Sequence, residues 1–235
     1  MLEAYVTNLG KYNEGALVGE YLKLPASTKD VQALLKQIGV DGVRYEEIFI
    51  TDYEMDIPGL YDCLGEYESI DELNYLASLL EGLDTGDMER FAAAVEYGEH
   101  TGSVKDLINL AQNLDCYDFY PGVRDEEDLG HIYIEDMDAL EVPEHLRNYI
   151  DYEAYGRDVA LDEDGHFTKD GYVLYTGGFT EVYSGWEDFP DEHRVFAYPQ
   201  PEKMSIRDTM AMYQKMIDSA PAVSKDRPAV SHEER

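Results

Sequence analysis

Residues 62–99 read DCLGEYESIDELNYLASLLEGLDTGDMERFAAAVEYGE. This stretch holds eleven carboxylates and a single base, Arg90, a composition typical of a solvated acidic segment. Apolar residues nevertheless recur at the spacing of one helix face, in two successive sets. The first set is Ile70, Leu73, Leu76, Ala77, Leu80 and Leu83, and the second is Met88, Phe91, Ala92 and Val95. The stretch is therefore predicted to form two packed helices that carry a dense negative charge.

Capping signals mark where these helices begin and end. Ser69 followed by Glu72 is typical of a capping box at a helix start, and Gly82 and Gly86 flank the end of the first helix. Ser103 with Asp106 predicts the start of a third helix, whose apolar face is Val104, Leu107, Ile108, Ala111 and Leu114. Residues 61–114 are therefore expected to form an acidic helical domain.

The preceding residues 1–60 are expected to form a small antiparallel sheet with one helix. Residues 2–8, 20–24 and 47–53 read as strands, the last because it is rich in β-branched and aromatic side chains. Residues 10–15, GKYNEG, read as a turn-rich loop. Ser27 or Thr28 begins a helix that runs to Ile38, where Gly39 ends it.

Residues 115–173 are expected to form an acidic mixed α/β domain. A short helix is predicted from Pro143, a second over residues 151–160, and a strand over residues 167–175. Residues 174–235 are expected to be a loop-rich C-terminal extension with one helix over 205–217 and a disordered end over 221–235. The fold class is thus α+β, with three small domains followed by this extension.

The negative charge is concentrated in two blocks. The chain carries 51 acidic and 18 basic residues, a formal charge of −33. Residues 44–99 contain 16 acids and 2 bases, and residues 115–170 contain 18 acids and 4 bases. Residues 1–43 are nearly neutral. A surface made acidic only for solubility would spread its charge more evenly, so the two blocks indicate a specific basic partner.

Composition excludes several classes of partner and location. DNA, RNA and anionic membrane surfaces require Lys and Arg, which are scarce here, so direct nucleic-acid or membrane binding is not expected. The N-terminus lacks the basic and apolar regions of a signal peptide, and no apolar run reaches the ~18 residues of a membrane helix. Two cysteines without metal or redox spacing fit a reduced cytoplasm.

Catalytic, metal and cofactor motifs are not expected. The segment from Asp162 to Gly165 resembles the start of a calcium loop, but His166 and Phe167 occupy the next positions, where an oxygen ligand and Gly are required. The six histidines form no HExxH pattern, and no phosphate loop or nucleophile motif occurs. We therefore expect no catalytic residues, no metal ligands and no cofactor.

Several blocks of this sequence resemble the ArdA family of antirestriction proteins, in consistent order over residues 3–173. They are AYVTNLGKYNEGALVGEYLKLP, YEEIFITDYE, GEYESIDELNYLASLLEGLD, YDFYPGV, DEEDLGHIYIE and PEHLRNYIDYEAYGRD. Residues 174–235 extend beyond the family pattern. The resemblance implies a protein of conjugative transposons and plasmids, acting in the cytoplasm of a bacterial host. It also implies an elongated chain of three small α/β domains and a homodimer joined through the third, 115–173, with the antirestriction motif near residues 79–97.

The resemblance further implies that the protein inhibits type I restriction–modification enzymes by imitating B-form DNA in the DNA-binding groove of the methyltransferase core. Its carboxylates would then occupy the sites that hold phosphates. The candidate partner-binding carboxylates are Glu46, Glu47, Asp52, Glu54, Asp62, Glu66, Glu68, Asp71, Glu72, Glu81, Asp84, Asp87, Glu89, Glu96, Glu99, Asp115, Asp118, Asp125, Glu126, Glu127, Asp128, Glu135, Asp136, Asp138, Glu141, Glu144, Asp151, Glu153 and Asp158.

Two other functions fit the composition. An acidic adaptor or chaperone for basic DNA-binding proteins would carry a similar charge. A hydrolase would need two carboxyl groups held at a defined separation in a cleft, and pairs of carboxylates in so acidic a chain are too common to indicate one.

Overall fold

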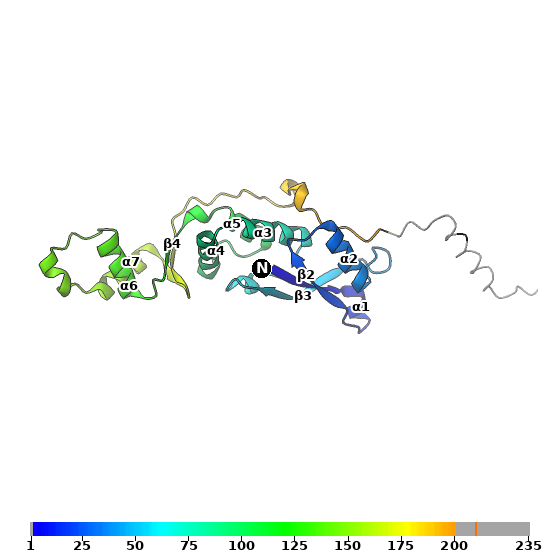
Figure 1. Ribbon diagram of the computed structural model, residues 1–235, viewed down its shortest axis with the longest axis horizontal. Coiled ribbons are helices and arrows are strands. Elements are labelled where there is room, and N and C mark those ends of the chain that lie inside the picture. The colour runs from blue at the N-terminus through cyan, green and yellow to red at the C-terminus, as the bar shows by residue number, and fades with distance from the viewer. Residues whose placement is uncertain (1, 201–209, 211–235) are drawn as a thin grey trace, which may run out of the picture. The chain divides into compact units, whose positions relative to one another are not determined.

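A computed structural model of the chain describes residues 2–200 and Met210 (Figure 1). Helices and small sheets occur together, so the α+β class is confirmed. The strands are β1 (Leu2–Asn8), β2 (Gly19–Leu24), β3 (Ile48–Met55), β4 (Tyr117–Pro121), β5 (His166–Phe167) and β6 (Gly171–Tyr175). The α-helices are α1 (Leu9–Asn13), α2 (Thr28–Ile38), α3 (Ile70–Gly82), α4 (Thr85–Tyr97), α5 (Val104–Ala111), α6 (Glu126–His131) and α7 (Tyr152–Glu163).

The first sheet has the strand order β2-β1-β3, and both pairings are antiparallel. Helix α2 follows β2 and buries Val31, Leu34, Leu35 and Ile38. Ser27 caps this helix in a complete capping box with Asp30, and Gly39 ends it in the left-handed conformation, with φ of 79°. The antiparallel sheet with one long helix was thus predicted correctly.

Helices α3, α4 and α5 share their apolar core with this sheet. Leu73 and Leu76 of α3, Phe91 of α4 and Leu107 of α5 lie in the same cluster as β1 residues such as Ala4. Ser69 accepts a hydrogen bond from the Glu72 N–H, and Ser103 accepts one from the Asp106 N–H, so both predicted helix starts are confirmed. Because this core includes residues on both sides of residue 60, the division into three domains stays a prediction.

The second sheet has the order β4-β6-β5 and packs with α6 and α7 around a smaller core. Gly130 of α6 and Gly156 of α7 are both buried where these helices meet. A side chain at Gly156 would overlap the Glu126 carbonyl oxygen, and one at Gly130 would overlap the Tyr152 carbonyl oxygen. The two glycines therefore permit the close approach of α6 and α7.

Several local predictions were wrong. Residues 10–15 were expected to form a loop, but residues 10–13 belong to α1. The Asn8 side chain caps this short helix. Residues 167–175 do not form a single strand, because a turn closed by Thr168 and Gly171 separates β5 from β6. The helix expected from Pro143 is a 3₁₀ segment, Glu144–Tyr149. Strand β4 and helix α6 were not predicted.

Beyond β6, residues 176–198 contain no strand and only two short 3₁₀ segments, Trp186–Asp188 and Asp191–His193. We call residues 176–198 the C-terminal strap, because they run along α5 and α3 toward α2 in yellow to orange (Figure 1). Apart from Met210, the helix predicted over 205–217 lies outside the described residues, as does the disordered end predicted over 221–235. Within the described part of the chain, no helix is long and apolar enough to cross a membrane.

Candidate functional site

The candidate carboxylates lie on ordered elements throughout the two acidic blocks. Those of the first block lie in the loop before β3, on β3, in the segment between β3 and α3, and along or just after α3 and α4. Those of the second block lie just before and on β4, along α6 and α7, and in the segment between these helices. The sheet and helix backbones therefore hold most of these charges in defined positions.

Most of these carboxylates are free to meet a partner. Of the 29 candidates, 21 are exposed, seven are half-buried and one, Asp71, is buried. Within the described residues, only Asp87, Glu135 and Glu144 form ion pairs with a basic side chain. We call the 28 candidates other than Asp71 the acidic surface. Its charge is largely uncompensated within the described part of the chain.

Some carboxylates of this surface also begin helices. Asp84 caps α4 by accepting a hydrogen bond of 2.9 Å from the Asp87 N–H, and Asp125 caps α6 through the Asp128 N–H at 3.0 Å. Asp151 caps α7 through the Ala154 N–H at 3.0 Å. Negative charge at a helix N-terminus is favoured by the unpaired N–H groups and the helix dipole. These three positions therefore combine a structural role with exposed charge.

The structure contradicts the assignment of Asp71 to the partner-binding set. Its side chain is only 5% exposed, and its Oδ1 atom accepts hydrogen bonds of 2.7 Å from the N–H groups of Val195 and Phe196. A carboxylate covered in this way cannot reach a cation on another protein. Sequence placed Asp71 in the first turn of a helix, where acids are usually exposed, and gave no sign of the covering strap.

Three half-buried carboxylates are partly occupied by tyrosine hydroxyl groups. The Tyr183 hydroxyl donates to Glu72 at 2.7 Å and the Tyr21 hydroxyl to Asp52 at 2.8 Å, and Tyr152 donates to Glu135. Glu135 also binds Arg147. The hydrogen bond to Asp52 raises the pKa of Tyr21, and burial together with the bond to Glu72 raises that of Tyr183. Both phenols therefore remain protonated donors at neutral pH.

Sequence reasoning missed the buried asparagines that hold the strap. Asn109 of α5 accepts hydrogen bonds from the Val182 and Tyr183 N–H groups, both at 2.8 Å. Asn113, just after this helix, pairs with both backbone groups of Thr180 at 2.9 Å. The sequence did contain one sign of this contact, which is a pair of asparagines four residues apart beside the apolar face of a short helix. Amides that are buried with such a face require hydrogen-bond partners.

The described residues contain no group of three or more His, Cys, Asp or Glu side chains that could hold a metal ion. The 350 Å³ cavity between β2, β3, α3 and α4 is lined mainly by apolar side chains such as Leu24, Met55 and Leu80. Lys23, Asp56 and Glu81 also line it, and Glu81 is the one candidate carboxylate among its lining residues. The exposed carboxylates are therefore the candidate functional site.

These features define an acidic α+β protein whose exposed charge is held on a rigid frame. The family model described as "Antirestriction protein (ArdA)" matches residues 4–174. The chain therefore belongs to the ArdA family of antirestriction proteins. Among curated proteins, none matches the chain.

Proposed function

We propose that this protein inhibits type I restriction–modification enzymes by imitating B-form DNA. In this proposal the acidic surface enters the DNA-binding groove of the methyltransferase core and meets the Lys and Arg side chains that hold DNA phosphates. The proposal includes no catalytic step, since the inhibitor acts by occupying the groove. The site of action would be the cytoplasm of a bacterial host.

The observation that carries the proposal is the uncompensated charge of ordered carboxylates. On α4, for example, Glu89 and Glu96 are exposed and have no ion pair among the described residues. Glu81 at the end of α3 is likewise exposed and has no ion pair among these residues. Because a helix backbone already holds these carboxylates in place, less ordering is needed on binding than for carboxylates on an unfolded chain. Opposite charges also steer the two proteins together rapidly.

The amount of charge matches a long stretch of DNA. Duplex DNA carries one negative charge per ~1.7 Å of its axis. A homodimer of this chain would carry about 66 formal negative charges, which corresponds to roughly 110 Å of duplex. A dimer would therefore be suited to an enzyme that contacts DNA over an extended groove.

The exposed apolar side chains between α6 and α7 support a homodimer. Met137, Leu140, Leu146 and Tyr149 are all exposed, and Tyr149 shows 83% of its surface. Apolar side chains at such density in an acidic segment favour burial against another protein surface. We propose that two copies associate through this segment. Sedimentation velocity of the Leu140→Asp variant tests this step, with a shift to monomer expected.

The test of mimicry is a set of charge neutralisations. A variant with Glu81, Glu89, Glu96 and Glu99 all changed to Gln loses four exposed charges of the acidic surface and keeps the side-chain shapes. We expect its inhibition constant against a type I enzyme to rise at least about tenfold, while each single change has less than a threefold effect, because exposed ion pairs each contribute little.

A matched control changes four acids outside the two acidic blocks. Glu202, Glu233 and Glu234 become Gln and Asp226 becomes Asn, so the net charge changes by the same amount. Equal weakening in both variants would show that only net charge matters, which is expected of an acidic adaptor. If the unaltered chain bound unrelated basic proteins as tightly as it binds the type I enzyme, the same conclusion would follow.

A further inference from the structure

The C-terminal strap lies beyond the family match, which ends at residue 174, yet it is part of the folded core. Tyr183, Phe189 and Val195 of the strap are buried in the same cluster as α3 and α5, and Tyr183 is only 2% exposed. The strap therefore replaces solvent along these helices and is not an appendage.

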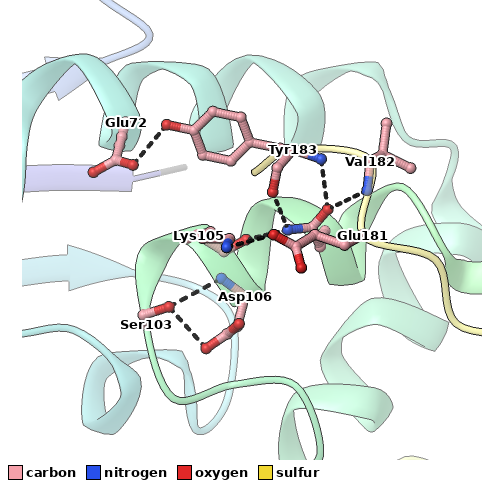
Figure 2. A network of polar contacts seen from close by, with 8 residues as sticks. Glu72, Ser103, Lys105, Asp106, Glu181, Val182 and Tyr183 are labelled. Carbon is pink, nitrogen blue, oxygen red and sulfur yellow. Dashed lines mark hydrogen bonds and ion pairs between the residues drawn. The ribbon is translucent and has the colours of Figure 1, made fainter. Parts of the chain in front are cut away.

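The Asn109 side chain of α5 recognises the backbone of the strap at Val182 and Tyr183. Asn109 accepts from two consecutive N–H groups, those of Val182 and Tyr183, and its amide nitrogen donates to the Tyr183 carbonyl at 2.8 Å. Figure 2 shows Val182 and Tyr183 beside α5, with the Tyr183 ring directed to Glu72. The ion pair between Lys105 and Glu181, at 2.5 Å, lies next to these contacts.

The strap then reaches α3 and the first sheet domain. Asp71 at the start of α3 accepts from Val195 and Phe196, as described above. Farther along, the Gln32 side chain of α2 donates to the Tyr198 carbonyl at 3.1 Å. The Tyr198 hydroxyl donates to the Glu46 carbonyl at 2.9 Å, in the loop that leads into β3. At the other end, Thr176 binds the Cys116 carbonyl beside β4.

A single segment is therefore fixed to α2, α3, α5 and the start of the second sheet. These are the elements that carry or adjoin both acidic blocks. The electrostatic attraction between two charges falls with their separation, so an array of carboxylates binds a fixed array of cations well only if its parts keep their spacing. Any freedom between the parts must be lost on binding, which weakens the complex.

We propose that the C-terminal strap is an internal clamp that sets the spacing of the acidic surface, with Asn109, Asn113 and Asp71 as positioning residues. This inference rests on the proposed DNA mimicry. The clamp adds affinity through rigidity, without contacting the partner at these three residues. It also gives a role to residues 176–198, which the family pattern does not include.

The test uses the full chain and the uncharged substitution Asn109→Ala. Asn13→Ala is the matched control, because Asn13 is exposed and its side chain makes no hydrogen bond within the described residues. Three quantities are measured: amide hydrogen exchange at Val182 and Tyr183, the inhibition constant at several salt concentrations, and the fraction of active inhibitor by stoichiometric titration against the enzyme.

For Asn109→Ala we expect faster exchange at both amides and an inhibition constant raised about tenfold. The active fraction and the salt dependence should be unchanged, because no charge is lost. Tyr183→Phe keeps the buried ring and removes only the bond to Glu72, so it should give a smaller rise in a chain that remains folded. Asn13→Ala should behave as the unaltered chain does.

Faster exchange with an unchanged inhibition constant would overturn the clamp. So would a loss of inhibition that comes entirely from a smaller active fraction, since that result describes unfolding alone. Failure of the unaltered chain to inhibit any type I enzyme would refute the proposed function itself. That outcome is distinguishable from the two results above, in which the unaltered chain inhibits and only the variant is informative.

Discussion

The hydroxyl of Tyr183 donates a hydrogen bond of 2.7 Å to the carboxylate of Glu72, a residue 111 positions earlier in the chain. This bond joins the C-terminal strap to the first turn of α3, next to Asp71, which binds the strap backbone. A carboxylate of the acidic surface is thus oriented by a segment that lies beyond the family match.

Changing Tyr183 to Phe should destabilise the protein by about 1 kcal/mol at neutral pH, because one hydrogen bond to a carboxylate is lost while the buried ring remains. Urea unfolding followed by circular dichroism measures this change. As a control, Tyr67→Phe removes a hydroxyl from an exposed ring that makes no hydrogen bond in the described chain, and it should leave the midpoint unaltered. Equal midpoints for all three proteins would contradict the bond's contribution.

Stability should decrease as the pH rises above about 10, the pKa of an unperturbed tyrosine. Burial raises the pKa of Tyr117, Tyr172 and Tyr183 in the folded protein. The unfolded chain therefore releases these protons first, and the stability present below pH 10 is lost progressively above it. Urea midpoints of unfolding at pH 8 and pH 11 test this. The difference in midpoint between the unaltered protein and the Tyr183→Phe variant should be smaller at pH 11 than at pH 8. A constant gap would count against a raised pKa for Tyr183.

Asp71 and Glu89 both lie on acidic helices, yet their removal should change the stability by very different amounts. Asp71→Ala leaves the N–H groups of Val195 and Phe196 without an acceptor, and we expect a loss of about 3 kcal/mol. Glu89→Ala removes an exposed charge without a partner among the described residues and should change stability by less than about 0.5 kcal/mol. Asp71→Asn retains an acceptor oxygen and should fall between them. A smaller effect for Asp71→Ala than for Glu89→Ala would show that the strap is not anchored there.

The contact between α6 and α7 makes a prediction about Gly156. Replacing glycine by alanine inside a helix usually stabilises the folded protein by about 1 kcal/mol. At Gly156, however, its methyl group would overlap the Glu126 carbonyl oxygen, and we expect a net loss of about 2 kcal/mol and a lower melting temperature. Gly82→Ala is the control, because open space surrounds that position at the end of α3. A rise in melting temperature for Gly156→Ala would mean that the two helices are farther apart than described.

The parts of the fold that sequence predicted are those with local signals. Ser69 and Ser103 are followed by acids three residues later and by apolar residues at helical spacing, and both begin helices. Strand β4 was missed because Pro121 and Gly122 resemble a turn, and α6 because only Leu129 and Gly130 of its residues are buried. In each case the local pattern is short and the neighbouring sheet or helix supplies the stability.

The candidate site was predictable only in part, for a related reason. Exposed acids follow from charge and helical periodicity, and 28 of the 29 candidates are at least partly exposed. Asp71 is the exception, because the backbone that covers it is more than 120 residues away along the chain. Asn109 and Asn113 likewise bind a segment that is remote in sequence. Contacts between a side chain and a distant backbone leave no periodic pattern to detect.

The dependence of inhibition on salt tests DNA mimicry most directly. Contacts between many exposed carboxylates and cationic side chains are screened as ionic strength rises, since the Debye length falls to about 8 Å at 0.15 M. The inhibition constant against a type I enzyme should therefore rise at least about tenfold between 50 and 200 mM salt, with the enzyme's own activity measured at each concentration. An inhibition constant that does not change over this range would contradict the account.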